Sequence, residues 1–170
     1  MRNPRLVTHA ADARPFLRST GERYDAIFVD AYRQPYIPFY LTTLEFFELA
    51  RDRLRPGGAL IVNVGHPEGS GDLERVLAST LGAVFPTVLR DPAKRINTLL
   101  LATTGDASAG RLRANAASLH PDLKPLAEEA ADRVGPAPRG GRVYTDDRAP
   151  VEWLIDSSIV EFAAEGEDGT

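Results

Sequence analysis

A short apolar run that ends in a carboxylate constrains the fold of this chain more than any other feature. Residues Tyr24–Asp30 read YDAIFVD, and a second run, Ala59–Val64, reads ALIVNV. Neither run alternates apolar and polar residues, as a strand with one solvated face would. Near-continuous apolar strands are typical of parallel sheets that helices cover on both faces. We therefore expect both runs to be buried strands of an α/β fold.

Helical patterns accompany these strands. Thr42 and Glu45 form a capping pair, and the apolar stripe behind them predicts a helix to about Arg55, where Pro56-Gly57-Gly58 stops it. The stretch Leu6–Ala11 is expected to be a further strand. Two more helices are expected over Arg14–Ser19 and Asp72–Leu81.

The later part of the chain changes character. Phe85–Leu89 and Thr98–Thr103 are two strands joined by a short polar turn, so we expect them to pair antiparallel. Together these patterns predict a doubly wound sheet that is mostly parallel and ends in an antiparallel hairpin. The expected organisation is a core over residues 1–104, a helical and extended segment over 105–160 that packs on it, and an acidic tail over 161–170.

Composition excludes several classes of function. The chain has 170 residues, a net charge of −4 and no cysteine. It therefore contains no disulfide framework, no thiolate zinc site and no catalytic thiol. The acidic balance disfavours a nucleic-acid partner, and no apolar run approaches the roughly 20 residues of a membrane span. The three histidines lie far apart, so no metal site is expected, and the default localisation is the cytoplasm.

Two carboxylates follow predicted strands. Asp12 comes after Leu6–Ala11, and Asp30 closes the buried run. Ligands of open α/β sheets bind outside the carboxyl ends of the strands, which makes both residues candidate site residues. Asp12 could accept hydrogen bonds from an amine or a hydroxyl, and Asp30 could act as a base or hold a cation. The alternative for each is that it only caps the following turn or helix.

Several motifs in order carry a resemblance. Asp12-Ala13-Arg14, then Tyr24–Asp30, then Leu41–Gly58 closing in Arg55-Pro56-Gly57-Gly58, resemble the second half of the spermidine synthase (polyamine aminopropyltransferase) family. The similarity covers about residues 5–104, and Thr145–Leu154 resembles the tail of such proteins. The resemblance implies a methyltransferase-type Rossmann fold whose N-terminal half, with its Gly-rich turn, has no counterpart in this sequence.

The resemblance also implies a reaction and a site. The family transfers an aminopropyl group from decarboxylated S-adenosylmethionine to an amine acceptor, so the chain, if active, is a transferase. Asp12 and Ala13 would contact the adenine, and Asp30 would be the catalytic carboxylate. A carboxylate is a weak base at neutral pH, so Asp30 would need help from its surroundings or would act by anchoring the cationic amine. The expected substrate contacts are Tyr32, Arg33, Gln34, Asp146 and Asp147, although the last two could equally cap Ala149–Ile155.

Two departures from the family leave other functions open. Arg33 stands where the family carries a second carboxylate, and a guanidinium about 6 Å from a substrate ammonium costs about 3 kcal/mol at an effective dielectric of about 20. This disfavours a diamine such as putrescine and favours a carboxylate-bearing acceptor, or none. The missing front half suggests an inactive interaction protein as one alternative. An S-adenosylmethionine-dependent methyltransferase is the other.

The missing front half also predicts an exposed sheet edge. Without its family neighbours, Tyr24–Asp30 would present an unpaired apolar edge, which seeks a partner. We expect either that Leu6–Ala11 moves beside it or that the chain forms a homo-oligomer through this edge.

Overall fold

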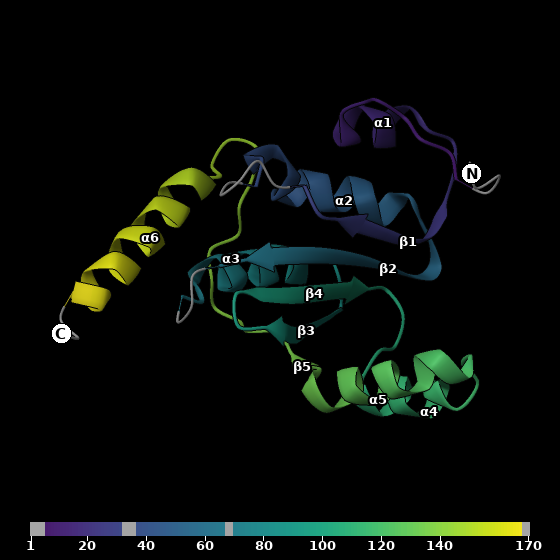
Figure 1. Ribbon diagram of the computed structural model, residues 1–170. Helices are drawn as coiled ribbons and strands as arrows, with labels where there is room; N and C mark the ends of the chain where they lie inside the picture. The colour runs from purple at the N-terminus through teal and green to yellow at the C-terminus, as the bar shows by residue number, and fades with distance from the viewer. Residues whose placement is uncertain (1–5, 32–36, 67–69, 168–170) are drawn as a thin grey trace.

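A five-stranded sheet lies at the centre of the computed structural model, which describes residues 6–31, 37–66 and 70–167. The strand order is β1-β2-β4-β3-β5, with β1 at one edge (Figure 1). The strands are β1 (Tyr24–Val29), β2 (Leu54–Gly65), β3 (Thr87–Lys94), β4 (Asn97–Thr103) and β5 (Gly135–Pro136).

The sheet is mixed. Within the described residues β1 pairs with β2 in parallel, whereas β2–β4, β3–β4 and β3–β5 are antiparallel. The predicted α/β fold and its antiparallel hairpin are therefore confirmed, with a smaller parallel share than expected. The reason is connection length: a helix crosses over between β1 and β2, whereas two residues join β3 to β4, which permits only a hairpin.

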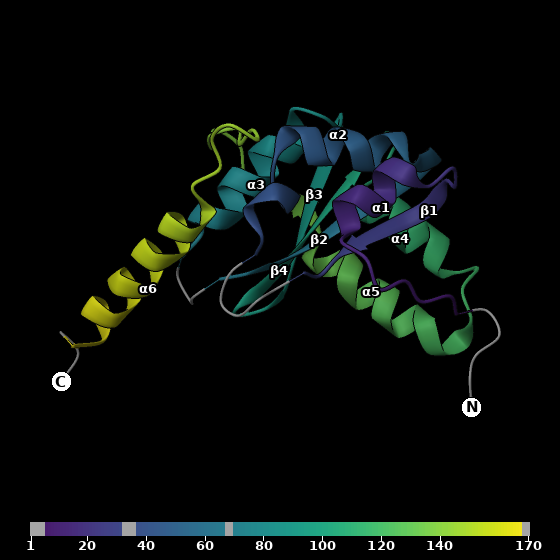
Figure 2. The same cartoon turned by 90° about the horizontal axis from the view of Figure 1, so that it is seen from above.

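Helices lie on both sides of the sheet. α2 and α3 occupy one side, and α4 and α5 the other (Figure 2). The core lies between the sheet and the first pair, where Phe47, Leu60, Leu77 and Leu100 are fully buried. The helices are α1 (Ala13–Ser19), α2 (Leu44–Asp52), α3 (Asp72–Gly82), α4 (Ala109–Ala116), α5 (Lys124–Arg133) and α6 (Val151–Glu167), with short 3-10 turns at Phe39–Leu41 and Pro121–Leu123.

The start of α2 differs from the predicted capping pair by one residue. Thr43, not Thr42, is the N-cap, and its Oγ1 accepts a hydrogen bond from the Phe46 N–H at 3.4 Å. The Thr42 hydroxyl instead donates to the carbonyl of Phe39. Glu45 does not close a capping box, because its carboxylate accepts a hydrogen bond from the backbone N–H of Asp146.

The predicted helix stop lies inside a strand. α2 ends at Asp52, and Pro56-Gly57-Gly58 belongs to the first half of β2. The register between β1 and β2 shifts there, from Tyr24 opposite Leu54 to Ala26 opposite Ala59. This bulge requires a positive φ of 77° at Gly57, a backbone conformation that glycine adopts without steric cost.

The predicted strand over Leu6–Ala11 is wrong. Residues 6–10 have no regular secondary structure, and Leu6 and Val7 are 68% and 74% exposed. An isolated strand leaves its backbone groups unpaired, so an apolar pattern alone does not hold this segment in strand conformation. Leu6–Ala11 therefore does not cover the edge of β1, and that alternative is also wrong. Phe28 of β1 remains 74% exposed.

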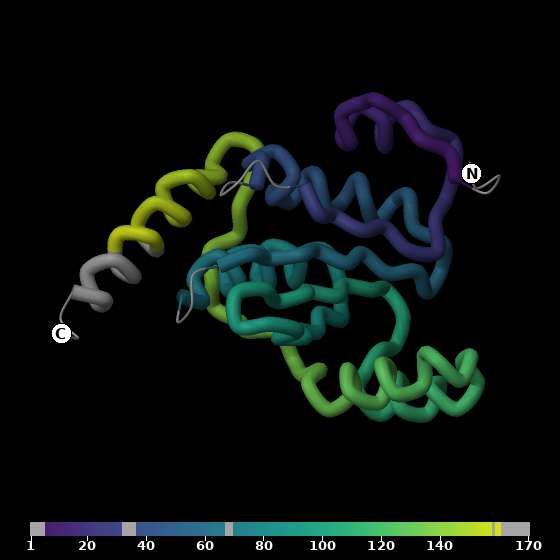
Figure 3. Tube along the Cα trace, viewed as in Figure 1, coloured from purple at the N-terminus to yellow at the C-terminus, as the bar shows by residue number. Residues whose placement is uncertain are grey.

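Among the residues of α6 whose burial the structure describes, the buried ones lie in its first turns. Val151 and Ile155 at the beginning of α6 are buried, and the helix then points away from the sheet (Figure 3). Among the described residues, no helix has both the length and the apolar character needed to cross a bilayer.

Candidate functional site

Two consecutive side-chain hydrogen bonds from asparagine amides hold Asp30 at the carboxyl end of the parallel strand pair. Asp30 directly follows β1, and Asn63 lies beside it on β2. The Asn63 Nδ2 donates a hydrogen bond to Asp30 Oδ1 at 2.9 Å, and Asn97 Nδ2 donates to Asn63 Oδ1 at 3.0 Å. The Asp30 carboxylate is thus held by a hydrogen bond from the neighbouring strand β2, and Asn97 on β4 holds Asn63 in turn.

Two cavities meet at Asp30. The first, which we call the apolar cavity, has a volume of about 520 Å³ and lies between α1 and β1. The second, which we call the polar cavity, has a volume of about 330 Å³ and opens on the face of the sheet opposite α2 and α3. The apolar cavity is lined by Val7, His9, Ala13, Phe16, Leu17, Tyr24, Ala26–Ala31, Leu41 and Phe46. The polar cavity is lined by Phe28–Asp30, Ile61, Asn63, Ala93, Lys94, Asn97 and Leu99.

Asp12 caps α1, as one of the two sequence interpretations expected. Its Oδ1 accepts a hydrogen bond from the Arg14 N–H at 3.0 Å, and its Oδ2 accepts one from the Tyr40 hydroxyl at 2.9 Å. The next residue, Ala13, lines the apolar cavity. The cap therefore holds Asp12 next to Ala13, while Asp12 itself does not line that cavity, and the expected adenine contact stays a prediction.

Asp146 is engaged by an arginine from the opposite end of the chain. Arg14 donates to both carboxylate oxygens of Asp146, from Nη1 at 2.8 Å and from Nη2 at 2.5 Å. Thr43 Oγ1 donates to the same carboxylate at 2.7 Å. These hydrogen bonds lower the pKa of Asp146, with the Arg14 bond as the main cause, and the same bond raises the pKa of Arg14. Asp146 thus ties α1 and α2 to the segment before α6, although it is exposed, as Asp147 is.

We expect Asp146→Asn to destabilise the fold by about 1 kcal/mol at pH 7, because an asparagine keeps the size but loses the charge-assisted bonds to Arg14. The folded-state pKa of Asp146 is lowered, so its contribution is fully present above the unfolded value of about 3.9 and is lost as the pH falls through the lower folded-state value. Urea unfolding at pH 7 and at pH 2.5 tests this: the difference from wild type should become smaller at the lower pH. Asp147→Asn is the matched control and should change neither value.

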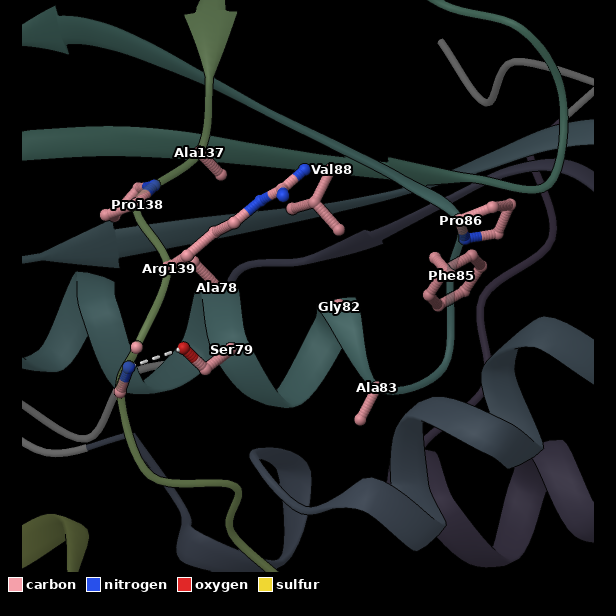
Figure 4. A pocket seen from close by; sticks show the side chains of 12 residues that line it. Ala78, Ser79, Gly82, Ala83, Phe85, Pro86, Val88, Ala137, Pro138 and Arg139 are labelled. Atoms are coloured by element: carbon pink, nitrogen blue, oxygen red, sulfur yellow. Dashed lines mark hydrogen bonds between the residues drawn. The ribbon is translucent and has the colours of Figure 1, made fainter.

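A third cavity lies away from these residues. It has a volume of about 440 Å³ between the C-terminal half of α3, the start of β3 and residues 137–141 (Figure 4). The Gly141 N–H donates to Ser79 Oγ at 2.8 Å, which closes one end of this cavity (Figure 4). None of its lining residues is acidic, and Asp12, Asp30 and Asp146 are not among them. We therefore place the candidate site at the carboxyl end of β1.

The structure brings some of the predicted site residues together and adds others. Asp12, Ala13 and Asp146 lie around Arg14. Asp30 lines the apolar cavity and directly follows the end of β1. The predicted contacts Tyr32, Arg33 and Gln34 lie outside the described residues. Sequence reasoning missed Asn63, Asn97 and Lys94. Asn63 carried a signal, since it is the polar residue within the apolar run ALIVNV.

Comparison with curated proteins finds polyamine aminopropyltransferases. A probable polyamine aminopropyl transferase of Bifidobacterium longum is 30% identical over 174 aligned positions, which cover 91% of this chain and 39% of that protein. A polyamine aminopropyltransferase of Vibrio vulnificus is 36% identical over 58 positions, which cover 32% of this chain and 19% of that protein. The chain thus spans about two fifths of the Bifidobacterium protein, and the resemblance indicated by the motifs is confirmed. No protein-family model matches the chain.

Comparison with solved structures shows the fold. A probable spermidine synthase from Corynebacterium glutamicum superposes with a TM-score of 0.57 at 22% identity, covering 86% of this chain and 57% of that one. Human methyltransferase-like protein 13, in complex with SAH, superposes with a TM-score of 0.55 at 18% identity, covering 90% of this chain and 68% of that one. The expected relationship to methyltransferase-type Rossmann folds is therefore confirmed.

Proposed function

We propose that this chain, which is similar to polyamine aminopropyltransferases over most of its length, acts in aminopropyl transfer from decarboxylated S-adenosylmethionine to an amine. One observation carries the proposal: the carboxylate of Asp30 lies where an apolar cavity and a polar cavity meet. A two-substrate transfer needs such a junction, because the donor and the acceptor must approach the same group from different sides.

The reaction defines what Asp30 must do. The lone pair of the acceptor amine attacks the carbon beside the sulfonium and forms a C–N bond. The C–S bond breaks, its electron pair stays on sulfur, and 5′-methylthioadenosine leaves. The acceptor ammonium must lose one proton before its nitrogen can attack, and the product amine remains protonated at neutral pH. Asp30 would accept this proton or anchor the cationic amine, with Asn63 holding the carboxylate in place.

The apolar cavity suits the nucleoside part of the donor. It measures about 520 Å³, its walls are mostly apolar, and Ala13 is one of the residues that line it. A purine ring stacks well against such walls. Asp12 already accepts two hydrogen bonds, and a carboxylate has capacity for about four, so it can still accept one from an adenine amino group.

Calorimetric titration of 5′-methylthioadenosine into the full chain tests the nucleoside site. We expect saturable binding that Asp12→Ala weakens by about tenfold or more, the loss of one charge-assisted hydrogen bond. Because Asp12→Ala also removes the cap of α1, Asp12→Ser serves as a second variant that keeps a capping oxygen. Asp25→Ala, at the opposite end of β1, is the matched control and should bind as wild type does. A folded chain that does not bind the nucleoside at millimolar concentration would contradict the proposal.

One observation favours a second candidate function. Strand β1 forms an edge of the sheet, and its Phe28 is 74% exposed beside Asp30. An apolar edge of this kind suits association, so an interaction protein that forms a homo-oligomer through β1 is the alternative. Absence of nucleoside binding together with a dimer in sedimentation would favour it. If the nucleoside binds, comparing methyl and aminopropyl donors separates a methyltransferase from an aminopropyltransferase.

A further inference from the structure

The polar cavity presents a carboxylate and an ammonium to the same space. Asp30 follows β1 and Lys94 ends β3, and both line the cavity of about 330 Å³. Asn63 on β2 and Asn97 on β4 lie between them in the order of the sheet. A ligand in this cavity therefore meets one anionic group, two amides and one cationic group.

The strand register holds Lys94 at this end of the sheet. Lys94 pairs with Asn97 across the β3–β4 hairpin, and Asn97 pairs with Gly65 at the end of β2. Since β1 and β2 run parallel, the end of β2 is also the end where Asp30 lies. The turn between β3 and β4 therefore lies at the same end of the sheet as Asp30. A shift in the β-strand register would move Lys94 away from Asp30.

Lys94 is available to a ligand. Its side chain is exposed, and within the described part of the chain it forms no ion pair or hydrogen bond. Among the described residues Asp30 accepts one side-chain hydrogen bond, from Asn63, and a carboxylate has lone pairs for further donors. Both charged groups therefore face the cavity with capacity to bind.

Apolar side chains line the cavity beside the two amides. Phe28, Ile61 and Leu99 line the same cavity on the face of the sheet opposite the core. Apolar side chains at this position suit a short run of methylene groups. The cavity is small, near the lower end of the range for small-molecule sites, which limits the ligand to a short aliphatic chain.

We infer that the acceptor is a short aliphatic zwitterion, an amine that also bears a carboxylate, with its amine at Asp30 and its carboxylate at Lys94. The inference rests on the proposed aminopropyl transfer and specifies its acceptor. In that reaction the amine end forms the new C–N bond as the C–S bond of the donor breaks, while the carboxylate end takes no part and only positions the molecule. A diamine would place its second ammonium against Lys94, where the two like charges repel each other.

Two ligands of equal length test this directly. 4-Aminobutanoate and 1,4-diaminobutane differ only in whether the far end is a carboxylate or an aminomethyl group. We would titrate each into the ¹⁵N-labelled full chain, without a donor, and follow the backbone amide signals of Asn63, Lys94 and Asn97. We expect 4-aminobutanoate to bind about tenfold more tightly, a modest ratio because Lys94 is exposed and screened by salt.

Charge reversal at the lysine provides the decisive variant. Lys94→Glu should invert the preference, so that 1,4-diaminobutane binds more tightly than 4-aminobutanoate. Lys124→Glu, which changes the only other lysine of the chain, is the matched control and should preserve the wild-type order. Equal binding of the two ligands, an unchanged order in Lys94→Glu, or no binding of either ligand would overturn the inference.

The same measurements distinguish a failure of the inferred acceptor from a failure of the proposed aminopropyl transfer. If 4-aminobutanoate binds at the polar cavity but 5′-methylthioadenosine does not bind, the zwitterion site is supported and the proposed transfer fails. If the nucleoside binds and 1,4-diaminobutane is the preferred ligand, the transfer is supported and the inference about the acceptor is overturned.

Discussion

Asp30→Asn is expected to lower the rate of 5′-methylthioadenosine release from decarboxylated S-adenosylmethionine by about 10²- to 10⁴-fold. This is the range for removal of a group that accepts or positions a proton in the transition state. The substitution keeps the size of the side chain, and the asparagine oxygen can still accept the hydrogen bond from Asn63. The expected loss therefore comes from the charge and basicity of the carboxylate rather than from its packing.

A control variant and a binding measurement show whether the loss of rate is specific to Asp30. Asp25→Asn changes the same residue type at the other end of β1, where Asp25 pairs with Arg55 at 2.6 Å, and should leave the rate unchanged. Calorimetry on Asp30→Asn should show the same affinity for 5′-methylthioadenosine as wild type. A full transfer rate in Asp30→Asn would remove Asp30 from the proposed chemistry. Equal losses in both variants would point to a general effect of charge on the strand.

Phe47→Ala is expected to cost about 3–5 kcal/mol of folding free energy, the usual range for truncating a buried phenylalanine. Phe47 lies on α2, is fully buried and packs against Phe46, with their ring centroids 5.8 Å apart. Its removal leaves a cavity between α2 and the sheet that rigid strands cannot fill by relaxing. Urea unfolding monitored by circular dichroism measures the change.

Phe39→Ala is the matched control for this prediction. Phe39 is 45% exposed, and its ring centroid lies 5.7 Å from that of Tyr40. Its truncation should therefore lower the free energy of unfolding by less than about 1 kcal/mol. Similar losses for the two variants would mean that α2 does not pack on the sheet as described. The size of the Phe47 effect also matters for function, because α2 carries the cap residue Thr43 that contacts Asp146.

The candidate site shows which residues a sequence pattern can identify. Asp30 was predictable because a carboxylate that ends a buried strand lies at the edge where ligands bind. Lys94 was not, since the sequence pattern there indicates only a polar turn, whereas in the structure Lys94 ends β3. The Asn63–Asn97 contact joins residues 34 positions apart, and it forms because β4 lies beside β2 in the sheet.

Errors in the predicted secondary structure have a common cause. The apolar stretch Leu6–Ala11 resembles a strand, but a strand forms only where a neighbour pairs with its backbone. Pro56-Gly57-Gly58 resembles a helix stop, yet it is a bulge in β2, because the alignment of β2 with β1 shifts at that point. In both cases the local pattern does not specify a pairing partner, and that partner, or its absence, sets the final conformation.

Asp146 shows most clearly the difference between what local sequence determines and what long-range contacts determine. Its sequence neighbourhood allowed two roles, contact with a cationic substrate or capping of the next helix. In the fold its charge is instead paired with Arg14, which lies 132 residues away. Local sequence thus establishes which segments are buried strands and which carboxylate ends one, because hydrophobic periodicity and chain direction are local properties. The partner of each charge depends on which strands and loops meet in space, and that is settled by long-range packing of the whole chain.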